Sequence, residues 1–288
     1  MPARCSPTPA TMPDARTRLL RENNPDFASF VLGGTHIRDV PAPDSLYPDR
    51  VIVSLPWSYN EQPERTYPVV YLCDGYWDFP LVWGLYSHLL YDKVVPEYIL
   101  VGLGYGGDKP DVDTLRKADL APPASPADDY LRRIKESLIP FVEAEYACDG
   151  SFRVIAGVSI GGAFALSALF RAPGLFQGAI ALSPTVESFD RWIFRLEEEY
   201  QQAGSTLATK LLGKRRELAA RLFLAAGGAD DARIVNGIEG FDRLLDSRGY
   251  RFFDKKYCRI EGEKHAGLKA EGMNRGLRHV FAGTAAAG

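Results

Sequence analysis

The stretch RVIAGVSIGGAFALSALF, residues 153–170, decides the fold. It begins with a short Val/Ile run typical of a buried strand and continues into a long apolar run with helical character. Between the two lies GVSIGG, residues 157–162, in which glycines flank one serine. A strand that turns directly into a helix is the repeating unit of α/β sheets. The stretch therefore predicts an α/β domain with Ser159 at a strand-to-helix corner.

Strand-like and helix-like segments alternate on both sides of this stretch. Several of the strand-like segments are continuous Val, Ile and Leu runs, as in parallel strands that are covered on both faces. This alternation predicts a mostly parallel central sheet with helices on both faces. The expected strands are residues 50–56, 67–75, 97–107, 152–159, 176–184, 220–228 and 252–260, and the expected helices are 128–146, 161–173 and 237–249.

The domain boundaries follow from composition. Residues 1–28 lack the apolar core of a secretory signal, and prolines at 2, 7, 9 and 13 argue against a targeting helix, so we expect a disordered tail. Residues 29–288 are expected to form a single catalytic domain. Two of its segments, 104–127 and 186–219, do not fit the simple alternation. Both follow strands and should lie at the carboxyl edge of the sheet, where ligands bind, as candidate walls or lids.

The overall composition, 46% hydrophobic and 25% charged, is ordinary for a globular protein. The net charge of −3 provides no general attraction to nucleic acid or anionic lipid, and no run approaches the roughly 18 apolar residues of a membrane span. The cysteines lack the spacing of a metal site, so we expect free thiols in a reducing compartment, the cytoplasm. No cofactor or metal is expected. The four cysteines are Cys5, Cys73, Cys148 and Cys258.

A serine at such a corner can act as a nucleophile if a histidine serves as its base. In folds of this class the chain order is serine, acid, histidine. His36 and His88 precede Ser159, and His279 lies in an expected terminal helix. His265 lies in CRIEGEKHAG, residues 258–267, just after a predicted strand. His265 is therefore the predicted base.

The acid should follow the strand at 220–228. The residues directly after this strand are Ala229-Asp230-Asp231. Either carboxylate could accept a hydrogen bond from the histidine and stabilise the imidazolium. Either could also cap the next helix, since aspartate is a favoured N-cap residue. We predict that Asp230 is the acid and keep Asp231 as the alternative.

Two backbone N–H groups are predicted to bind an oxyanion. The N–H of Ile160 opens the helix after Ser159, and the N–H of Tyr76 follows the turn at Asp74-Gly75. Aromatic and basic side chains near these strand ends are candidate substrate contacts. They are Trp77, Phe79, Trp83, Tyr105, Arg116, Lys117 and Arg191.

Several blocks resemble the putative-esterase family of α/β-hydrolases. They are YPVVYLCDGYWDF, GVSIGGAFALSALFRAPGLFQGAIALSP, AAGGADD and EGEKHAG, in an order that extends over about residues 30–282. The family includes enterochelin and other siderophore esterases, S-formylglutathione hydrolase, feruloyl esterases and mycobacterial mycolyltransferases. DTLRKADLAPP, residues 113–123, is similar to the Arg-Asp-Leu-Thr-Pro segment of the enterochelin-esterase-like branch.

The resemblance implies an α/β-hydrolase fold with Ser159 as nucleophile, His265 as base, an acid near Asp230, and oxyanion amides at Tyr76 and Ile160. The expected function is hydrolysis of a small-molecule carboxylic ester through an acyl-enzyme, with a siderophore-like or other natural-product ester or lactone as substrate. An acyltransferase, cyclase or thioesterase with the same triad stays open, and a dry, lidded pocket would favour transfer. A non-catalytic binding module is the remaining alternative.

Overall fold

The computed structural model describes residues 32–42, 45, 47–122, 126–203 and 215–284. The chain divides into two units, residues 1–33 and 34–288, and every described helix and strand belongs to the second. The predicted tail, residues 1–28, and Cys5 lie outside the described residues. The account that follows concerns the second unit.

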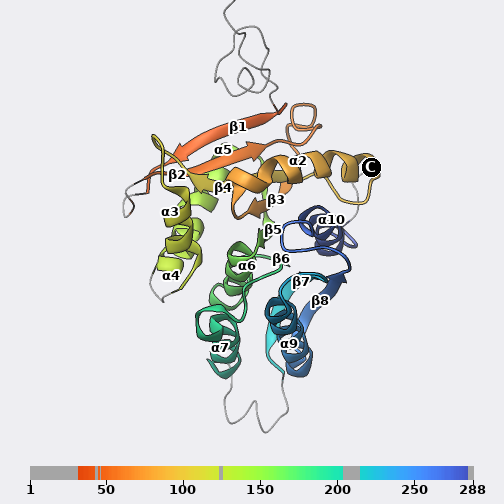
Figure 1. Ribbon diagram of the computed structural model, residues 1–288. Helices are drawn as coiled ribbons and strands as arrows, with labels where there is room; N and C mark the ends of the chain where they lie inside the picture. The colour runs from red at the N-terminus through yellow and green to blue at the C-terminus, as the bar shows by residue number, and fades with distance from the viewer. Residues whose placement is uncertain (1–31, 43–44, 46, 123–125, 204–214, 285–288) are drawn as a thin grey trace, which may run out of the picture. The chain divides into compact units, whose positions relative to one another are not determined.

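The second unit contains one eight-stranded sheet in the order β1-β2-β4-β3-β5-β6-β7-β8 (Figure 1). β2 runs antiparallel to both of its neighbours, β1 and β4, and every other pair of neighbouring strands, from β4 across to β8, is parallel. This is the predicted α/β-hydrolase fold. The strands are β1 (Thr35–Val40), β2 (Asp49–Ser54), β3 (Tyr67–Leu72), β4 (Ile99–Tyr105), β5 (Cys148–Val158), β6 (Gly178–Leu182), β7 (Glu217–Gly227) and β8 (Arg251–Ile260).

Helices cover both faces of the sheet. α2 and α10 contact each other and lie over one face, whereas α6 and α9 lie over the other, with α3 and α7 packed on α6. No helix among the described residues is long and apolar enough to cross a membrane. The helices are α2 (Gly75–Tyr91), α3 (Val112–Leu120), α4 (Pro126–Arg133), the π-helix η1 (Ile134–Leu138), α5 (Ile139–Glu145), α6 (Ile160–Arg171), α7 (Ser188–Ala203), α9 (Ala232–Arg248) and α10 (Lys269–Val280).

Strand β6 shows why the two faces take different helices. Successive side chains of a strand point to opposite faces. Ile180 faces α10 so closely that a Cβ added to Gly276 would lie 2.7 Å from it. The neighbours Ala179 and Ala181 belong instead to the large buried cluster that includes Phe164 of α6. All of β6 is buried, which explains its continuous apolar sequence.

All seven predicted strands are present, and β1 is the strand that sequence reasoning missed. Its sequence, THIRDV, is polar and mostly exposed because β1 is an antiparallel edge strand that pairs only with β2. The pattern of a doubly covered strand is therefore absent from it. The helices α2, α3 and α7 were also not predicted individually.

The two predicted inserts both contain helices. Segment 104–127 includes α3, and segment 186–219 includes α7. Residues 204–214 of the second segment lie outside the described residues. The first turn of α7 is unusual, because three successive side-chain-bearing residues, Phe189 to Arg191, have φ near 54°. The lid or wall role of the two segments stays a prediction.

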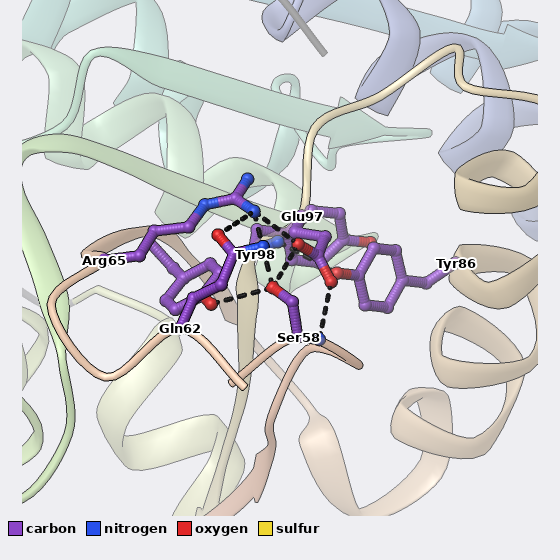
Figure 2. Close-up of polar contacts among 7 residues, drawn as sticks. Ser58, Gln62, Arg65, Tyr86, Glu97 and Tyr98 are labelled. Carbon is purple, nitrogen blue, oxygen red and sulfur yellow. Dashed lines mark hydrogen bonds and ion pairs between the residues drawn. The ribbon is translucent and has the colours of Figure 1, made fainter. Parts of the chain in front are cut away.

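The amino edge of the sheet carries a dense polar cluster (Figure 2). Glu97, just before β4, accepts hydrogen bonds from the Ser58 hydroxyl (2.5 Å) and from Arg65 Nη1 (2.7 Å). The Ser58 hydroxyl also lies 2.8 Å from the hydroxyl of Tyr67, the first residue of β3. These contacts attach the loop after β2 to the starts of β3 and β4. The predicted site residues follow the opposite, carboxyl ends of the parallel strands.

The three described cysteines are free thiols, as predicted. Cys73 is fully buried just after β3, and burial raises the pKa of its thiol far above the usual range. A protonated, buried thiol is a poor nucleophile. Cys73 therefore serves as a small apolar residue of the core.

Candidate active site

Ser159 lies at the corner between β5 and α6 with a strained backbone. Its φ of 60° and ψ of −121° lie outside the regions that residues with a side chain normally occupy. The Ser159 N–H donates to the carbonyl of Leu182 at the end of β6 (2.8 Å), which fixes the corner. A Cβ added to Gly157 would lie 2.4 Å from the backbone of Gly161. The turn is therefore tight enough to require glycine at position 157.

Ser159 is also the exception to the burial of its surroundings. All residues from Val154 to Phe170 are buried except Ser159, which is partly exposed. The packed residues on both sides keep the corner rigid. Its side chain is thus held at a fixed point beside the helix N-terminus, where the positive end of the helix dipole lies.

Asp230 and His265 are in direct contact. Nδ1 of His265 lies 2.9 Å from Oδ2 of Asp230, whose side chain is only 7% exposed. The other carboxylate oxygen accepts a hydrogen bond from the N–H of Asp231 (2.8 Å). A histidine that donates from Nδ1 to this carboxylate has Nε2 as the ring nitrogen that can accept a proton.

Asp231 has a different partner. It is the N-cap of α9, and its side chain accepts a hydrogen bond from the N–H of Arg233 (2.8 Å). Its carboxylate also pairs with the Arg233 guanidinium, and both side chains are largely exposed. The two adjacent acids therefore have separate contacts, one to the histidine and one to the helix.

The loop that carries His265 is fixed to the end of β7. The N–H of Gly228 donates to the Ile260 carbonyl (2.7 Å), and the N–H of Ala229 donates to the Glu263 carbonyl (2.9 Å). A Cβ added to Gly227 would lie 2.6 Å from that same Glu263 carbonyl oxygen. Glycine at 227 thus allows the histidine loop to approach the strand end that leads to the acid.

The two predicted oxyanion donors follow neighbouring strands. β3 and β5 pair in parallel, with Leu72 opposite Ala156. Tyr76 lies in the first turn of α2, and Ile160 is the first residue of α6. The first N–H groups of a helix have no intrahelical acceptor, so both can bind an anion. Ser159 lies on the chain directly before one of these donors.

The three other histidines lie away from this arrangement. His36 is on the edge strand β1, and His88 is in the last turn of α2. His279 is in α10, where burial lowers its pKa. None of them has a described contact with Asp230 or Asp231.

The candidate substrate contacts separate into exposed and buried side chains. Tyr76 and Trp77 are exposed (61% and 48%), so they can line a mouth beside the oxyanion donors. Phe79 is 1% exposed and packs on Gly102 of β4, which places it in the core and not at the mouth. Trp83, one turn further along α2, is partly buried.

Tyr105 ends β4 and is nearly buried. Burial raises the pKa of its hydroxyl, which is hydrogen-bonded to Asp119. A small cavity nevertheless reaches its ring from the side of α2. The lining residues are Cys73, Asp74, Tyr76, Trp77, Leu103, Gly104, Tyr105, Val112, Leu120 and Tyr130.

Arg116 contacts the protein itself. Its guanidinium forms a two-point ion pair with Asp74 and lies 5.5 Å from the centre of the Trp77 ring. Lys117, the next residue, is exposed. Arg191 pairs with Glu187 at 3.1 Å. The anion contact predicted for Arg116 would therefore compete with an existing internal carboxylate.

A wider cavity of about 600 Å³ lies elsewhere and contains none of the predicted site residues. It borders α4, η1 and the end of α6. Since Ser159 precedes the first residue of α6 and the cavity lies at the last, the helix separates the two. Its lining residues are Leu131, Arg132, Lys135, Glu136, Arg171, Ala172, Pro173 and Leu175.

Sequence reasoning missed one ion pair beside the site. Lys269 Nζ, at the start of α10, donates to Asp78 Oδ1 in the first turn of α2 (2.6 Å). The two residues are 191 positions apart, so no local pattern indicates the pair. Lys269 lies four residues after His265, at the first position of α10.

Comparisons with known proteins identify the family of this chain and proteins that share its fold. Residues 48–259 match the family model described as putative esterase. The ferri-bacillibactin esterase BesA of Bacillus subtilis (strain 168) is 25% identical, and the alignment covers 91% of this chain and 94% of that protein. Two solved structures share the fold. They are the BES protein from Bacillus cereus (TM-score 0.75, 22% identity, covering 88% of this chain and 97% of that one) and the siderophore hydrolase EstA from Aspergillus nidulans (TM-score 0.72, 20% identity, covering 87% and 96%).

Proposed function

The chain belongs to the putative-esterase family and is a carboxylic ester hydrolase, and from that premise we propose that it works through an acyl-enzyme formed on Ser159. The observation that carries this proposal is the contact between Asp230 and His265 at the same sheet edge as the strained serine corner. Asp230 follows β7, His265 follows β8 and Ser159 follows β5. Because parallel strands present their carboxyl ends at one edge, all three residues lie at that edge, which supports the proposal.

The first step is attack of the Ser159 hydroxyl on the ester carbonyl carbon. Nε2 of His265 accepts the hydroxyl proton as the new C–O bond forms. The resulting imidazolium is stabilised by the carboxylate of Asp230, 2.9 Å from Nδ1. The imidazolium then gives its proton to the leaving alcohol oxygen as the old ester bond breaks.

The negative charge of the tetrahedral intermediate is bound by the N–H groups of Tyr76 and Ile160. Both belong to first turns of helices, so their donors are oriented before the substrate arrives. Removal of one such donor in a serine hydrolase costs about 10²–10³ in kcat. Water activated by the same histidine then attacks the acyl-enzyme and releases the acid.

The proposed substrate class is the ester bond of a siderophore or a related natural product. The support is the relative of Bacillus subtilis that matches along 91% of this chain and is a ferri-bacillibactin esterase. The exposed aromatic side chains of Tyr76 and Trp77 beside the oxyanion donors suit a substrate with aromatic groups.

The test compares the wild-type protein with Ser159→Ala and His265→Ala. Turnover is measured on p-nitrophenyl esters of increasing acyl length and on ferri-bacillibactin. We expect wild-type hydrolysis of both kinds of ester and a loss of about 10³–10⁶-fold in kcat in each variant. Mass spectrometry after brief mixing should show the acyl group on the peptide that contains Ser159.

Two results would contradict the proposal. Variants with wild-type turnover would remove Ser159 and His265 from the chemistry. Products formed only when an alcohol or amine acceptor is added would identify an acyltransferase with the same residues. Because free acid and acyl-acceptor product differ in mass, one chromatographic assay distinguishes hydrolysis from transfer.

A further inference from the structure

The histidine loop, defined here as residues 261–268, connects β8 to α10 and carries His265. It must keep that side chain at a fixed place relative to two separate parts of the proposed site. One part is the acid after β7, and the other is the oxyanion donor in the first turn of α2. The described contacts include one attachment toward each part, and they lie on opposite sides of the histidine along the chain.

The first attachment precedes the histidine. The N–H of Ala229 donates to the carbonyl of Glu263, two residues before His265. Ala229 is itself the residue before Asp230. This contact joins two backbone atoms and involves no side chain. It therefore sets the distance between the base and the acid.

The second attachment follows the histidine. Lys269 comes four residues after His265 and donates from Nζ to Oδ1 of Asp78 at 2.6 Å. The side chain of Asp78 is 6% exposed and that of Lys269 is 27% exposed, so the pair is mostly shielded from water. Ion pairs in such surroundings are screened much less than exposed ones.

Asp78 belongs to the turn that presents the oxyanion donor. The N–H groups of Trp77 and Asp78 both donate to the carbonyl of Asp74, which closes the first turn of α2 around Tyr76. Burial raises the pKa of Asp78, and the ammonium of Lys269 opposes that effect. An Asp78 carboxylate without the lysine would be a poorly solvated charge within two residues of the donor.

We propose that Lys269 and Asp78 are positioning residues, whose ion pair holds the histidine loop against the first turn of α2. The pair thereby sets the spacing between the base and the oxyanion donor, whereas the backbone contact at Glu263 sets the spacing between base and acid. This inference rests on the proposed function for its catalytic consequence. The mechanical consequence, a loop that loosens when the pair is removed, does not depend on any activity.

The test uses Lys269→Met, Asp78→Asn, the double variant and Lys269→Arg. With p-nitrophenyl acetate we expect each single neutral variant to lose about 10–100-fold in kcat with KM changed less than about threefold, because the substrate's ground state does not contact the pair. The double variant should be no worse than the more impaired single variant, since the residues act as a unit. Lys269→Arg keeps the positive charge and should retain a kcat within about fivefold of the wild-type value.

The matched control is Lys264→Met, which removes a lysine charge one residue from His265. Lys264 is exposed and makes no ion pair among the described contacts. This variant should keep wild-type kcat and KM. It separates the loss of the specific pair from a general change of charge near the histidine.

Two structural readouts complete the test. Amide hydrogen exchange over residues 261–272 should speed up at least about tenfold in Lys269→Met and stay at the wild-type rate in Lys264→Met. The downfield proton signal of His265 Nδ1 should persist in both, because the contact with Asp230 is independent of the pair.

The outcomes separate the two proposals. Wild-type kcat and wild-type exchange in Lys269→Met would overturn the positioning role. Loss of the Nδ1 signal together with kcat would also overturn it, since the pair would then serve the acid. An inactive wild-type protein with faster loop exchange in Lys269→Met would reject the proposed function and support the attachment. If Lys269→Met does not fold, Asp78→Asn and Lys269→Arg decide the question by the same readouts.

Discussion

The guanidinium of Arg116 binds the carboxylate of Asp74 at two points, with Nε to Oδ1 at 2.6 Å and Nη2 to Oδ2 at 2.8 Å. Asp74 is the left-handed residue that precedes α2, and its side chain is 6% exposed. Its Oδ2 would lie 3.0 Å from a Cβ added to Gly161 in the first turn of α6. The ion pair thus lies where α2, α3 and α6 meet, beside both proposed oxyanion donors.

The first prediction concerns Arg116→Met. It leaves a buried carboxylate without its partner, so we expect a loss of about 1.5–3 kcal/mol in the free energy of unfolding. We also expect a lower kcat, because the turn before Tyr76 loses its support. Urea denaturation and p-nitrophenyl ester kinetics measure the two effects, and Lys117→Met is the exposed neighbour that should change neither.

A different outcome would return Arg116 to the substrate-binding role expected from the sequence. In that case Arg116→Met would keep the stability of the wild-type protein. Its KM would rise for esters that carry an anionic group and stay constant for neutral ones. A double variant with Asp74→Asn distinguishes the cases further, since removing both charges should recover stability only if the internal pair matters.

The second prediction compares the two adjacent acids. Asp230→Asn should lower kcat by about 10²–10⁴-fold, because an amide can hold the imidazole in the wrong tautomer and does not stabilise the imidazolium. Asp231→Ala should keep kcat and lower the unfolding temperature, because α9 loses its N-cap. Steady-state kinetics and thermal denaturation of both variants check this. The reverse pattern would make Asp231 the acid.

The third prediction concerns a buried charge cluster near the start of β2. Arg133 pairs with Asp49 (3.2 Å) and with Asp119 (2.8 Å), and the arginine side chain is 10% exposed. Burial raises the pKa of both carboxyls, and Arg133 opposes it. The Tyr105 hydroxyl also contacts Asp119. Arg133→Met should therefore destabilise the fold by about 3–5 kcal/mol at neutral pH.

The pH dependence of that variant has a definite sign. Carboxyl groups with a folded-state pKa above the unfolded value favour folding at low pH, and this contribution is lost as the pH rises through the folded pKa. The stability difference between Arg133→Met and wild type should consequently shrink as the pH falls from about 8 to about 5. Urea midpoints across this range measure it. Arg132→Met, whose side chain is 46% exposed, should cost less than about 1 kcal/mol at every pH.

The fourth prediction uses two exposed tryptophans. Trp77 is 48% exposed beside the proposed oxyanion donors, and Trp57 is 64% exposed next to the polar cluster at the opposite sheet edge. Trp77→Ala should raise KM for aromatic esters by about 2–10-fold through lost ring contacts. Trp57→Ala should leave KM unchanged. Equal effects of the two substitutions would argue against a binding surface at Trp77.

Much of the fold could be predicted because its signals are local. Gly157 is needed by a sharp turn within neighbouring residues, because a Cβ there would meet Gly161 four positions later. The apolar runs of the parallel strands reflect cover on both faces. The strand β1 was not predicted because its exposed edge position gives it a polar sequence. Phe79 was predicted at the mouth of the site, but its ring packs on Gly102 of β4.

The sequence by itself determined the α/β fold and the serine corner, because the signals of a strand, a turn and a helix lie in neighbouring residues. It also predicts His265 as the base, because the order of the histidines along the chain can be read directly. The tertiary structure decided which of two adjacent acids contacts the histidine, that Arg116 binds Asp74, and that Lys269 pairs with Asp78. Each of those contacts joins side chains on different strand ends or helices, 35, 42 and 191 positions apart. Such partners are set by which strands become neighbours in the sheet, and that arrangement exists only after the chain has folded.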